Sequence, residues 1–194
     1  ISSSNGKKMI LDAMQENSQN LRGIIDKLLT AAFLENRTSV EKNGSFACND
    51  ICREVMSHIR LKCPDTVKMQ YVSHVPDSLR IVTNTDALPK MLRQMLDNAN
   101  QFTKQGTITL ECMQNADKSI TFMITDTGIG IAPEDEERIF VPFLKLDYYA
   151  EGLGIGLTLI RRGAEVLGGT FIYDNTYKEG TRFVLNLPQE ETSS

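Results

Sequence analysis

Apolar residues recur at helical spacing over the first part of the chain. No proline occurs between residues 7 and 37, and the apolar positions follow one another at steps of three, four and seven: Met14, Leu21, Ile25, Leu28 and Ala32. This spacing predicts one long amphipathic helix with a coiled-coil seam, in which polar Ser18 fills one seam position. Because a single helix cannot bury such a seam, we expect it to pack against partner helices.

A polar stretch over residues 38–44 separates this helix from a second, shorter one. The second helix is expected to begin near Asn49 or Asp50, since either side chain could supply the oxygen that caps a helix N-terminus. We place a domain boundary in the polar stretch. The chain is thus divided into the segment of the long helix at residues 1–38, a domain at 39–190 and a polar tail at 191–194.

Strand-like and helix-like runs alternate beyond that boundary. The strand-like runs alternate in polarity or are continuously apolar, whereas the helix-like runs carry apolar residues three and four apart. We expect strands at 68–75, 78–82, 107–113, 119–126, 170–173 and 181–187, and helices at 86–103, 133–140 and 155–167. The turn at 115–118 predicts a hairpin between the third and fourth strands. This order predicts an α+β fold, a two-layer sandwich with helices over a mixed sheet.

Composition narrows the classes of function. The 194 residues are 41% hydrophobic and 24% charged, which is typical of one globular domain with an appendage. A formal net charge of -4 provides no general attraction for nucleic acid or for an anionic membrane surface, so we expect neither as a partner. No stretch approaches the roughly 20 apolar residues that cross a bilayer. Four scattered cysteines favour buried thiols in a reducing compartment, so a cytoplasmic location is expected.

A cluster of glycines is the first candidate for ligand chemistry. Gly152, Gly154 and Gly156 precede a predicted helix, whose positive end could hold phosphate oxygens through backbone amides. A dinucleotide-binding loop of this type would follow a parallel strand directly, but residues 146–151 are polar and irregular. Taken alone, the glycines could equally form an ordinary flexible turn.

Two polar residues in structured segments are further candidates. Asp126 ends the apolar run 120–124 beside a glycine-rich turn, and a buried carboxylate there needs a donor such as the amino group of adenine. The alternative is an aspartate that caps its own turn. Asn98 lies on the predicted helix 86–103, where its amide oxygen could bind Mg²⁺ together with nucleotide phosphates, or could simply be exposed.

Taken in order, these segments resemble the N, G1, F and G2 boxes of the GHKL ATPase superfamily, and specifically those of sensor histidine kinases. The resemblance covers about residues 45–188, and residues 23–35 also resemble the end of a dimerisation helix. The matching segments are 92–103 for the N box, 126–130 for G1, 139–143 for the F box, 152–157 for G2, and 180–183 with 187–188 for the closing strand.

The resemblance implies a Bergerat ATP-binding fold, with ATP and Mg²⁺ as cofactors. Asn98 matches the Mg²⁺-binding asparagine, Asp126 the adenine-binding aspartate, and Thr181 a residue that lines the adenine pocket. The nucleotide-binding residues carried over from the family are Asn98, Gln101, Phe102, Asp126, Gly128, Gly130, Ile131, Lys145, Gly152, Gly154, Gly156, Leu157 and Thr181. The resemblance also implies a homodimer through the N-terminal helix, a cytoplasmic position in a sensor, and a response-regulator receiver domain as partner.

Some positions depart from the family pattern. Gln94 stands where many histidine kinases have asparagine and where the hydrolases of the superfamily have a glutamate base. An amide cannot accept a proton usefully at neutral pH, so Gln94 argues against a self-sufficient ATP hydrolase. Gln101 stands where kinases often place a lysine facing the phosphates. Some electrostatic stabilisation of the phosphates is therefore missing, unless Lys145 or Lys104 compensates.

The phosphoacceptor histidine of the family has no match in the sequence. His58 and His74 are the two histidines, and neither is followed by the family's acidic neighbour. We expect the acceptor upstream of Ile1, so the chain should bind nucleotide without phosphorylating itself. The alternatives are a serine kinase of the anti-sigma-factor type, which the long helix disfavours, and an inactive nucleotide-binding module that only docks partners.

Overall fold

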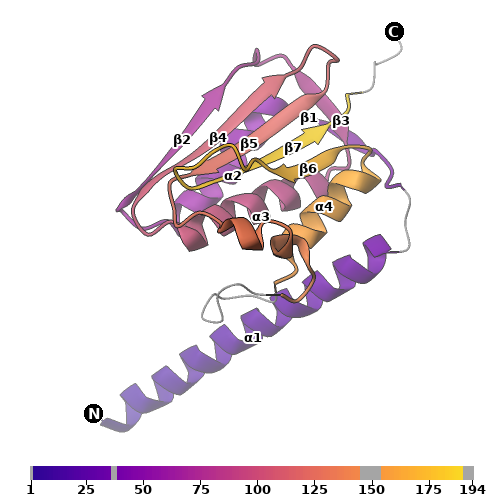
Figure 1. Ribbon diagram of the computed structural model, residues 1–194. Coiled ribbons are helices and arrows are strands. Elements are labelled where there is room, and N and C mark those ends of the chain that lie inside the picture. Colours follow the sequence, from indigo (N-terminus) through magenta and orange to yellow (C-terminus); the bar gives the residue numbers. More distant parts are fainter. Residues whose placement is uncertain (1, 36–38, 145–153, 190–194) are drawn as a thin grey trace.

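The computed structural model describes residues 2–35, 39–144 and 154–189 (Figure 1). The helices are α1 (Ser2–Glu35), α2 (Cys48–Arg60), α3 (Ala87–Phe102) and α4 (Gly156–Val166), with short 3-10 helices η1 (Pro133–Asp135) and η2 (Arg138–Phe140). The strands are β1 (Gly44–Ala47), β2 (Val67–Ser73), β3 (Arg80–Thr83), β4 (Gly106–Gln114), β5 (Ile120–Asp126), β6 (Thr170–Tyr173) and β7 (Thr181–Leu187).

Five of the strands form one mixed sheet in the order β2-β4-β5-β7-β6. The β2–β4 pair is parallel and the other pairs are antiparallel, including the hairpin predicted between β4 and β5. Helices α2, α3 and α4 lie against one face of this sheet (Figure 1). The predicted α+β fold, with a helical layer over a mixed sheet, is confirmed.

A single hydrophobic core lies between the helical layer and the sheet. Alternate residues of β5 face it, and Phe122 and Ile124 are almost completely buried there. From the helical side, α3 contributes Leu92 and Met95, both without exposed surface. Burying a side chain of this size contributes roughly 1.5 to 3 kcal/mol. The core therefore fixes α3 over the centre of the sheet, which positions the polar residues on the same helix.

Helix α1 extends away from this core (Figure 1). Four of its predicted seam residues, Met14, Leu21, Ile25 and Leu28, are exposed, from 64% of the surface of Met14 to 43% of that of Leu28. The helix contacts α4, and just beyond it the Val40 N–H donates to the Val166 carbonyl oxygen at 3.1 Å. The long helix is confirmed, and its packing on partner helices stays a prediction. None of the described helices is both long enough and apolar enough to span a membrane.

The prediction that Asn49 or Asp50 caps the N-terminus of α2 is wrong. The helix begins at Cys48 and its N-cap residue is Ala47, which has no side chain that could accept a hydrogen bond. Asp50 lies within the first turn of the helix and pairs with exposed Arg53 at 3.4 Å. The reason is tertiary, because the first turn of α2 packs directly on the sheet and turns Asn49 into the interior, where it is 2% exposed.

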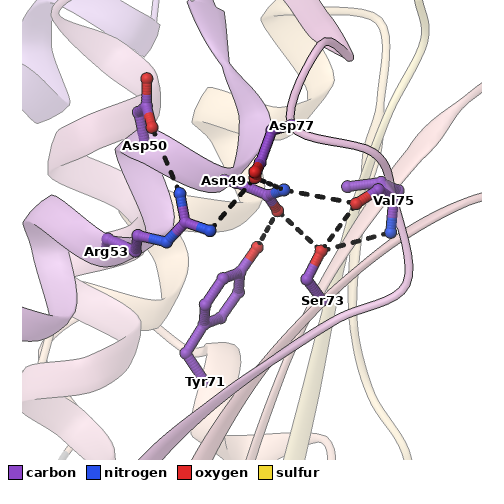
Figure 2. A network of polar contacts seen from close by, with 7 residues as sticks. All are labelled: Asn49, Asp50, Arg53, Tyr71, Ser73, Val75 and Asp77. Carbon is purple, nitrogen blue, oxygen red and sulfur yellow. Dashed lines mark hydrogen bonds and ion pairs between the residues drawn. The ribbon is translucent and has the colours of Figure 1, made fainter.

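The buried Asn49 side chain joins α2 to β2 and to the loop that follows β2 (Figure 2). Its Nδ2 group donates to the Val75 carbonyl oxygen at 3.3 Å and to Asp77 Oδ1 at 2.6 Å. Its Oδ1 atom accepts from the Ser73 and Tyr71 hydroxyls. Both ends of the amide are therefore satisfied, as burial of a polar side chain requires.

Two other elements differ from the prediction. The helix expected over residues 133–140 is divided into η1 and η2. Four consecutive acidic residues at 134–137 repel one another and provide no apolar face, so a continuous helix is disfavoured. Strand β1 was not predicted, because its four residues carry little pattern of their own and are held by antiparallel pairing with β3.

Three of the four cysteines match the expectation of buried thiols, and Cys63 is only half-buried. All four are free, and Cys48, Cys52 and Cys112 are buried between α2 and β4. A hydrogen bond with Cys48 lowers the pKa of the Cys112 thiol, but the interaction with Cys52 and burial outweigh it and raise this pKa to about 12. Buried thiols that stay protonated are inert packing groups.

Candidate nucleotide-binding site

Asp126 is a buried carboxylate at the end of β5, with 3% of its surface exposed. Its Oδ1 atom accepts a hydrogen bond from the Gly128 N–H at 2.8 Å. Burial raises the pKa of this carboxyl above its ordinary value, and the N–H groups of Gly128 and Thr181 lower the pKa in part. A carboxylate has about four acceptor positions. Asp126 therefore caps its own turn, and it keeps capacity for a donor from a ligand.

The glycine-rich loop after β5 lies against two other segments. A Cβ atom added to Gly128 would lie 2.4 Å from the Phe102 carbonyl oxygen, and one added to Gly130 would lie 3.3 Å from the Gly180 carbonyl oxygen. The Ile129 N–H donates to the same Phe102 oxygen at 3.3 Å. The loop is thus held between the end of α3 and the start of β7.

The start of β7 approaches Asp126 from the other side. Thr181 is the register partner of Asp126 in the sheet and is 5% exposed. A Cβ atom added to Gly180 would lie 2.0 Å from the Asp126 carbonyl oxygen, so no other residue fits there. Ile131 is half-buried and packs on the core. The predicted G1 segment and the closing strand are therefore adjacent.

The polar face of α3 lies against the start of α4. A Cβ atom added to Gly156 would lie 2.9 Å from Gln94 Nε2. Asn98 follows Gln94 by one helical turn, so it lies on the same face, and it is half-buried. Gln101 and Phe102 occupy the next turn and are also half-buried. The N box and the described part of G2 therefore meet.

The F box is anchored by packing against α4 and the sheet. The Phe140 ring lies edge-on to those of Phe171 and Phe183, with centroids 6.0 and 6.5 Å away. The Arg161 guanidinium carbon lies 3.3 Å from the centroid of the Phe140 ring. Thr158 Oγ1 donates to the Phe140 carbonyl oxygen at 3.0 Å. Leu157, next to Thr158 on α4, is partly buried against the core.

The two chain segments that flank residues 145–153 are held together. The Phe143 N–H donates to the Gly154 carbonyl oxygen at 3.0 Å. Gly154 has a φ of 69°, and a Cβ atom there would lie 2.7 Å from the Leu144 carbonyl oxygen. Lys145 and Gly152, two of the predicted nucleotide-binding residues, lie outside the described residues.

Asn98 fits a magnesium site that is completed by a ligand. Within 2–35, 39–144 and 154–189, no group of three or more His, Cys, Asp or Glu residues is arranged to hold a metal ion. Mg²⁺ usually takes one or two protein oxygens and completes its shell with phosphate oxygens and water. A neutral amide oxygen on the face that looks toward α4 suits that arrangement.

One polar residue at this site was missed by the sequence prediction. Thr103 directly follows α3 and has no exposed surface. Its Oγ1 atom has no hydrogen-bond partner among the described residues, although it lies close enough to Asp126 to lower the pKa of that carboxyl. Thr103 is the last residue of the segment 92–103 that resembles the N box, but the sequence prediction assigned it no role.

Comparisons with known proteins agree with this geometry. Residues 83–191 match the family described as histidine kinase-, DNA gyrase B-, and HSP90-like ATPase. The chain is 26% identical over 181 residues to histidine protein kinase DivJ of Caulobacter vibrioides, a match covering 91% of the chain and 30% of the relative. It is 28% identical over 191 residues to sensor histidine kinase GacS of Pseudomonas protegens, covering 92% of the chain and 21% of the relative.

A solved structure shares the fold. Full-length ShkA in complex with AMPPNP superposes with a TM-score of 0.83 and 21% identity, over 96% of this chain and 40% of that one. The chain thus spans less than half the length of ShkA and less than a third of DivJ and GacS. Over the matched region, a layer of helices on a mixed sheet is common to this chain and to that structure.

Proposed function

The chain belongs to the histidine kinase-, DNA gyrase B-, and HSP90-like ATPase family, and from this premise we propose that it binds Mg·ATP and presents the γ-phosphoryl group to a histidine. Its similarity to the histidine kinases DivJ and GacS supports the histidine kinase branch of the family. We take residues 39–190 as the ATP-binding unit, and residues 1–38 as one helix of a dimerisation unit.

The observation that carries the proposal is the buried Asp126 carboxylate between two glycine segments. An ionised carboxylate can accept a hydrogen bond from the exocyclic amino group of adenine. The Asp126 carboxylate is already oriented, because its Oδ1 atom accepts from the Gly128 N–H at 2.8 Å. Thr181 and Gly130 border the same position from β7 and from the loop. Adenine is therefore assigned to the Asp126 end of the site.

The phosphates are assigned to the other end, between α3 and α4. Helix α4 begins at Gly156, and its first N–H groups have no partner within the helix. These groups and the positive end of the helix dipole suit phosphate oxygens. Asn98 would hold Mg²⁺, which would supply charge neutralisation for the transfer. In this proposal Gln101 and Phe102 border the phosphates on α3, and Gly154 and Leu157 flank the start of α4. Gly152 and Lys145 are assigned to the phosphates from the sequence resemblance alone.

The chemistry is an in-line transfer. An imidazole nitrogen of the acceptor histidine attacks the γ-phosphorus, the bond to the β,γ-bridging oxygen breaks, and ADP leaves. The chain contributes positioning and electrostatic stabilisation, as is usual in phosphoryl transfer. Gln94 provides no carboxylate base for water, which supports transfer to a side chain rather than hydrolysis.

The acceptor histidine is expected on another segment. His58 is exposed on α2, and His74 pairs through Nε2 with Glu111 Oε1 at 3.1 Å on the sheet. Neither belongs to the face of α3 that carries Asn98. The exposed apolar residues of α1 support a homodimer, in which helices of a partner bring an acceptor to the site. Onward transfer to a receiver-domain aspartate, on the cytoplasmic side of a sensor, completes the proposed function.

A titration with ATP tests the proposal. We expect saturable binding that is tighter with Mg²⁺ than with a chelator, and we expect Asn98→Ala to remove that difference while leaving the metal-free affinity unchanged. Asn175→Ala, at an exposed position, is the matched control. An absence of binding to the wild-type chain would favour the alternative of an inactive docking module.

A further inference from the structure

The residues that lead into β1 are hydrogen-bonded to two helical regions of the domain. We refer to residues 39–43 as the linker. The Val40 N–H donates to the carbonyl oxygen of Val166, the last residue of α4, at 3.1 Å. The Glu41 carbonyl oxygen accepts from Asn84 Nδ2 at 2.9 Å, and Asn84 lies just before α3. The linker therefore joins the end of α4 to the start of α3.

The Asn84 side chain serves the linker and α3 at the same time. Its Oδ1 atom accepts from the N–H groups of Asp86 and Ala87 at 3.1 and 2.9 Å. The first N–H groups of a helix have no partner inside it, so this oxygen satisfies donors at the start of α3. The Nδ2 group of the same amide holds the Glu41 carbonyl oxygen. One side chain thus fixes the linker relative to α3.

A second asparagine holds the same turn from the linker side. Asn43 Oδ1 accepts from the N–H and the hydroxyl of Thr85 at 2.8 and 3.1 Å. A Cβ atom added to Gly44 would lie 2.6 Å from Thr85 Cγ2, so the chain passes close to the turn at this point. The attachment of the linker to the start of α3 therefore does not depend on a single contact.

Helices α3 and α4 run in opposite directions where they pack together. A Cβ atom added to Gly163 would lie 2.8 Å from Met91 Sδ, and one added to Gly156 would lie 2.9 Å from Gln94 Nε2. The start of α4 therefore faces the later part of α3, which carries Asn98. The linker contacts the opposite ends of the two helices. It joins them on the side remote from the proposed phosphates.

We propose that the linker regulates the nucleotide site: when bound, it holds α3 and α4 at the spacing that Mg·ATP requires, and bound nucleotide in turn holds the linker in place. The inference rests on the proposed function, because that function assigns the phosphates to the region between α3 and α4. Such coupling is reciprocal, so the linker strengthens ATP binding by the factor by which ATP stabilises the bound linker. Because the linker follows α1 in the chain, nucleotide binding is connected to the position of that helix.

The variants Asn84→Asp and Asn84→Ser separate the linker contact from the start of α3. Both keep an oxygen that can accept there, and both remove the Nδ2 group that donates to Glu41. Aspartate adds a charge and serine does not, so agreement between the two variants excludes a purely electrostatic effect on ATP. Loss of one hydrogen bond corresponds to about 3- to 10-fold in an equilibrium constant, so both variants should weaken Mg·ATP binding by about that factor.

Hydrogen exchange of the linker amides and calorimetry with Mg·ATP, both on the whole chain, test the inference. In wild type, saturating Mg·AMPPNP should slow exchange of the Val40 N–H by the same factor, whereas in both Asn84 variants exchange should be fast and independent of nucleotide. Asn115→Asp is the matched control, since Asn115 Nδ2 donates to the Ser119 and Thr121 hydroxyls at 2.9 and 2.8 Å, away from the linker. It should lose stability and keep the wild-type ATP affinity and linker exchange.

The outcomes are distinct. If wild type binds Mg·ATP but nucleotide leaves linker exchange unchanged, or if either Asn84 variant binds ATP as tightly as wild type, the linker is only a tether. The inference is then overturned while the proposed function stands. An equal loss of ATP affinity in Asn115→Asp also overturns it. If wild type binds no nucleotide, the proposed function itself fails, and the inference fails with it.

Discussion

Replacing Asp126 with asparagine changes one atom at the centre of the candidate site. The amide oxygen can still accept the Gly128 N–H, which now lies 2.8 Å from Oδ1, so the turn should be preserved. The other end of the side chain changes from an acceptor to an NH₂ donor. That donor would face the donor amino group of adenine, so the variant separates ligand recognition from folding.

The expected magnitudes follow from the burial of the carboxyl. Loss of a buried hydrogen bond to a charged acceptor costs about 1 to 3 kcal/mol, or roughly 5- to 150-fold in the Kd for ATP. Stability should change in the opposite direction. Burial raises the pKa of Asp126, so the ionised form is disfavoured in the fold at neutral pH. The neutral amide avoids this cost, and Asp126→Asn without nucleotide should be as stable as wild type or more so.

Calorimetry with Mg·ATP and thermal unfolding without nucleotide measure the two effects. Asp117→Asn is the matched control, because Asp117 lies in the β4–β5 turn and accepts from the Ser119 N–H at 3.0 Å. It should lose some stability and keep the wild-type affinity. An unchanged ATP affinity in Asp126→Asn would refute the adenine assignment, and a large loss of stability would refute the reasoning about its burial.

Three further changes test the fold. Asn49→Ala removes the hydrogen bonds of a buried amide to Val75, Asp77 and Ser73 and should lower the free energy of unfolding, measured in urea, by about 2 to 3 kcal/mol without altering the ATP affinity of the folded chain. An equal loss in exposed Asn175→Ala would contradict this. Gly128→Ala places Cβ 2.4 Å from the Phe102 carbonyl oxygen, so it should cost about 1 to 3 kcal/mol of stability and weaken ATP binding. Thermal unfolding and ATP titration measure the two effects, and no change in either would show that the loop can shift. Hydrogen bonds from Asn49 and then Arg53 hold the pKa of Asp77 below its ordinary value. Their contribution to the free energy of unfolding is therefore present above about pH 4 and is lost as the pH falls through the lowered pKa. Between about pH 7 and pH 3, urea unfolding should show a smaller loss of stability in Asp77→Asn than in wild type.

The elements that were predicted correctly are those whose own residues carry the pattern. Helix α1 repeats its apolar seam over several turns, and the β4–β5 hairpin alternates around a clear turn, so neither needs information from elsewhere in the chain. Strand β1 and the start of α2 depend instead on distant partners. Gly44–Ala47 becomes a strand because β3 pairs with it, and Asn49 turns inward because Tyr71 and Ser73 satisfy its oxygen.

The candidate site divides in the same way. The order of the glycine segments, Asn98 and Asp126 was sufficient to suggest one nucleotide site, and the structure brings the described members of these segments together. Their roles in binding stay predictions. Contacts between segments were beyond the sequence, as with Gln94 against Gly156 and Thr103 beside Asp126. Such contacts depend on the packing of α3 over the sheet, which no local pattern encodes.

Amide chemical shifts recorded during a titration with Mg·AMPPNP test the central claim most directly, because they report each segment separately. We expect saturable shifts that share one Kd at Asn98, Gly128, Gly130, Gly156 and Thr181, with none in the Asn49 network that joins α2 to β2 (Figure 2). Shifts confined to one of these segments, or different affinities at α3 and at the loop after β5, would contradict a single nucleotide site.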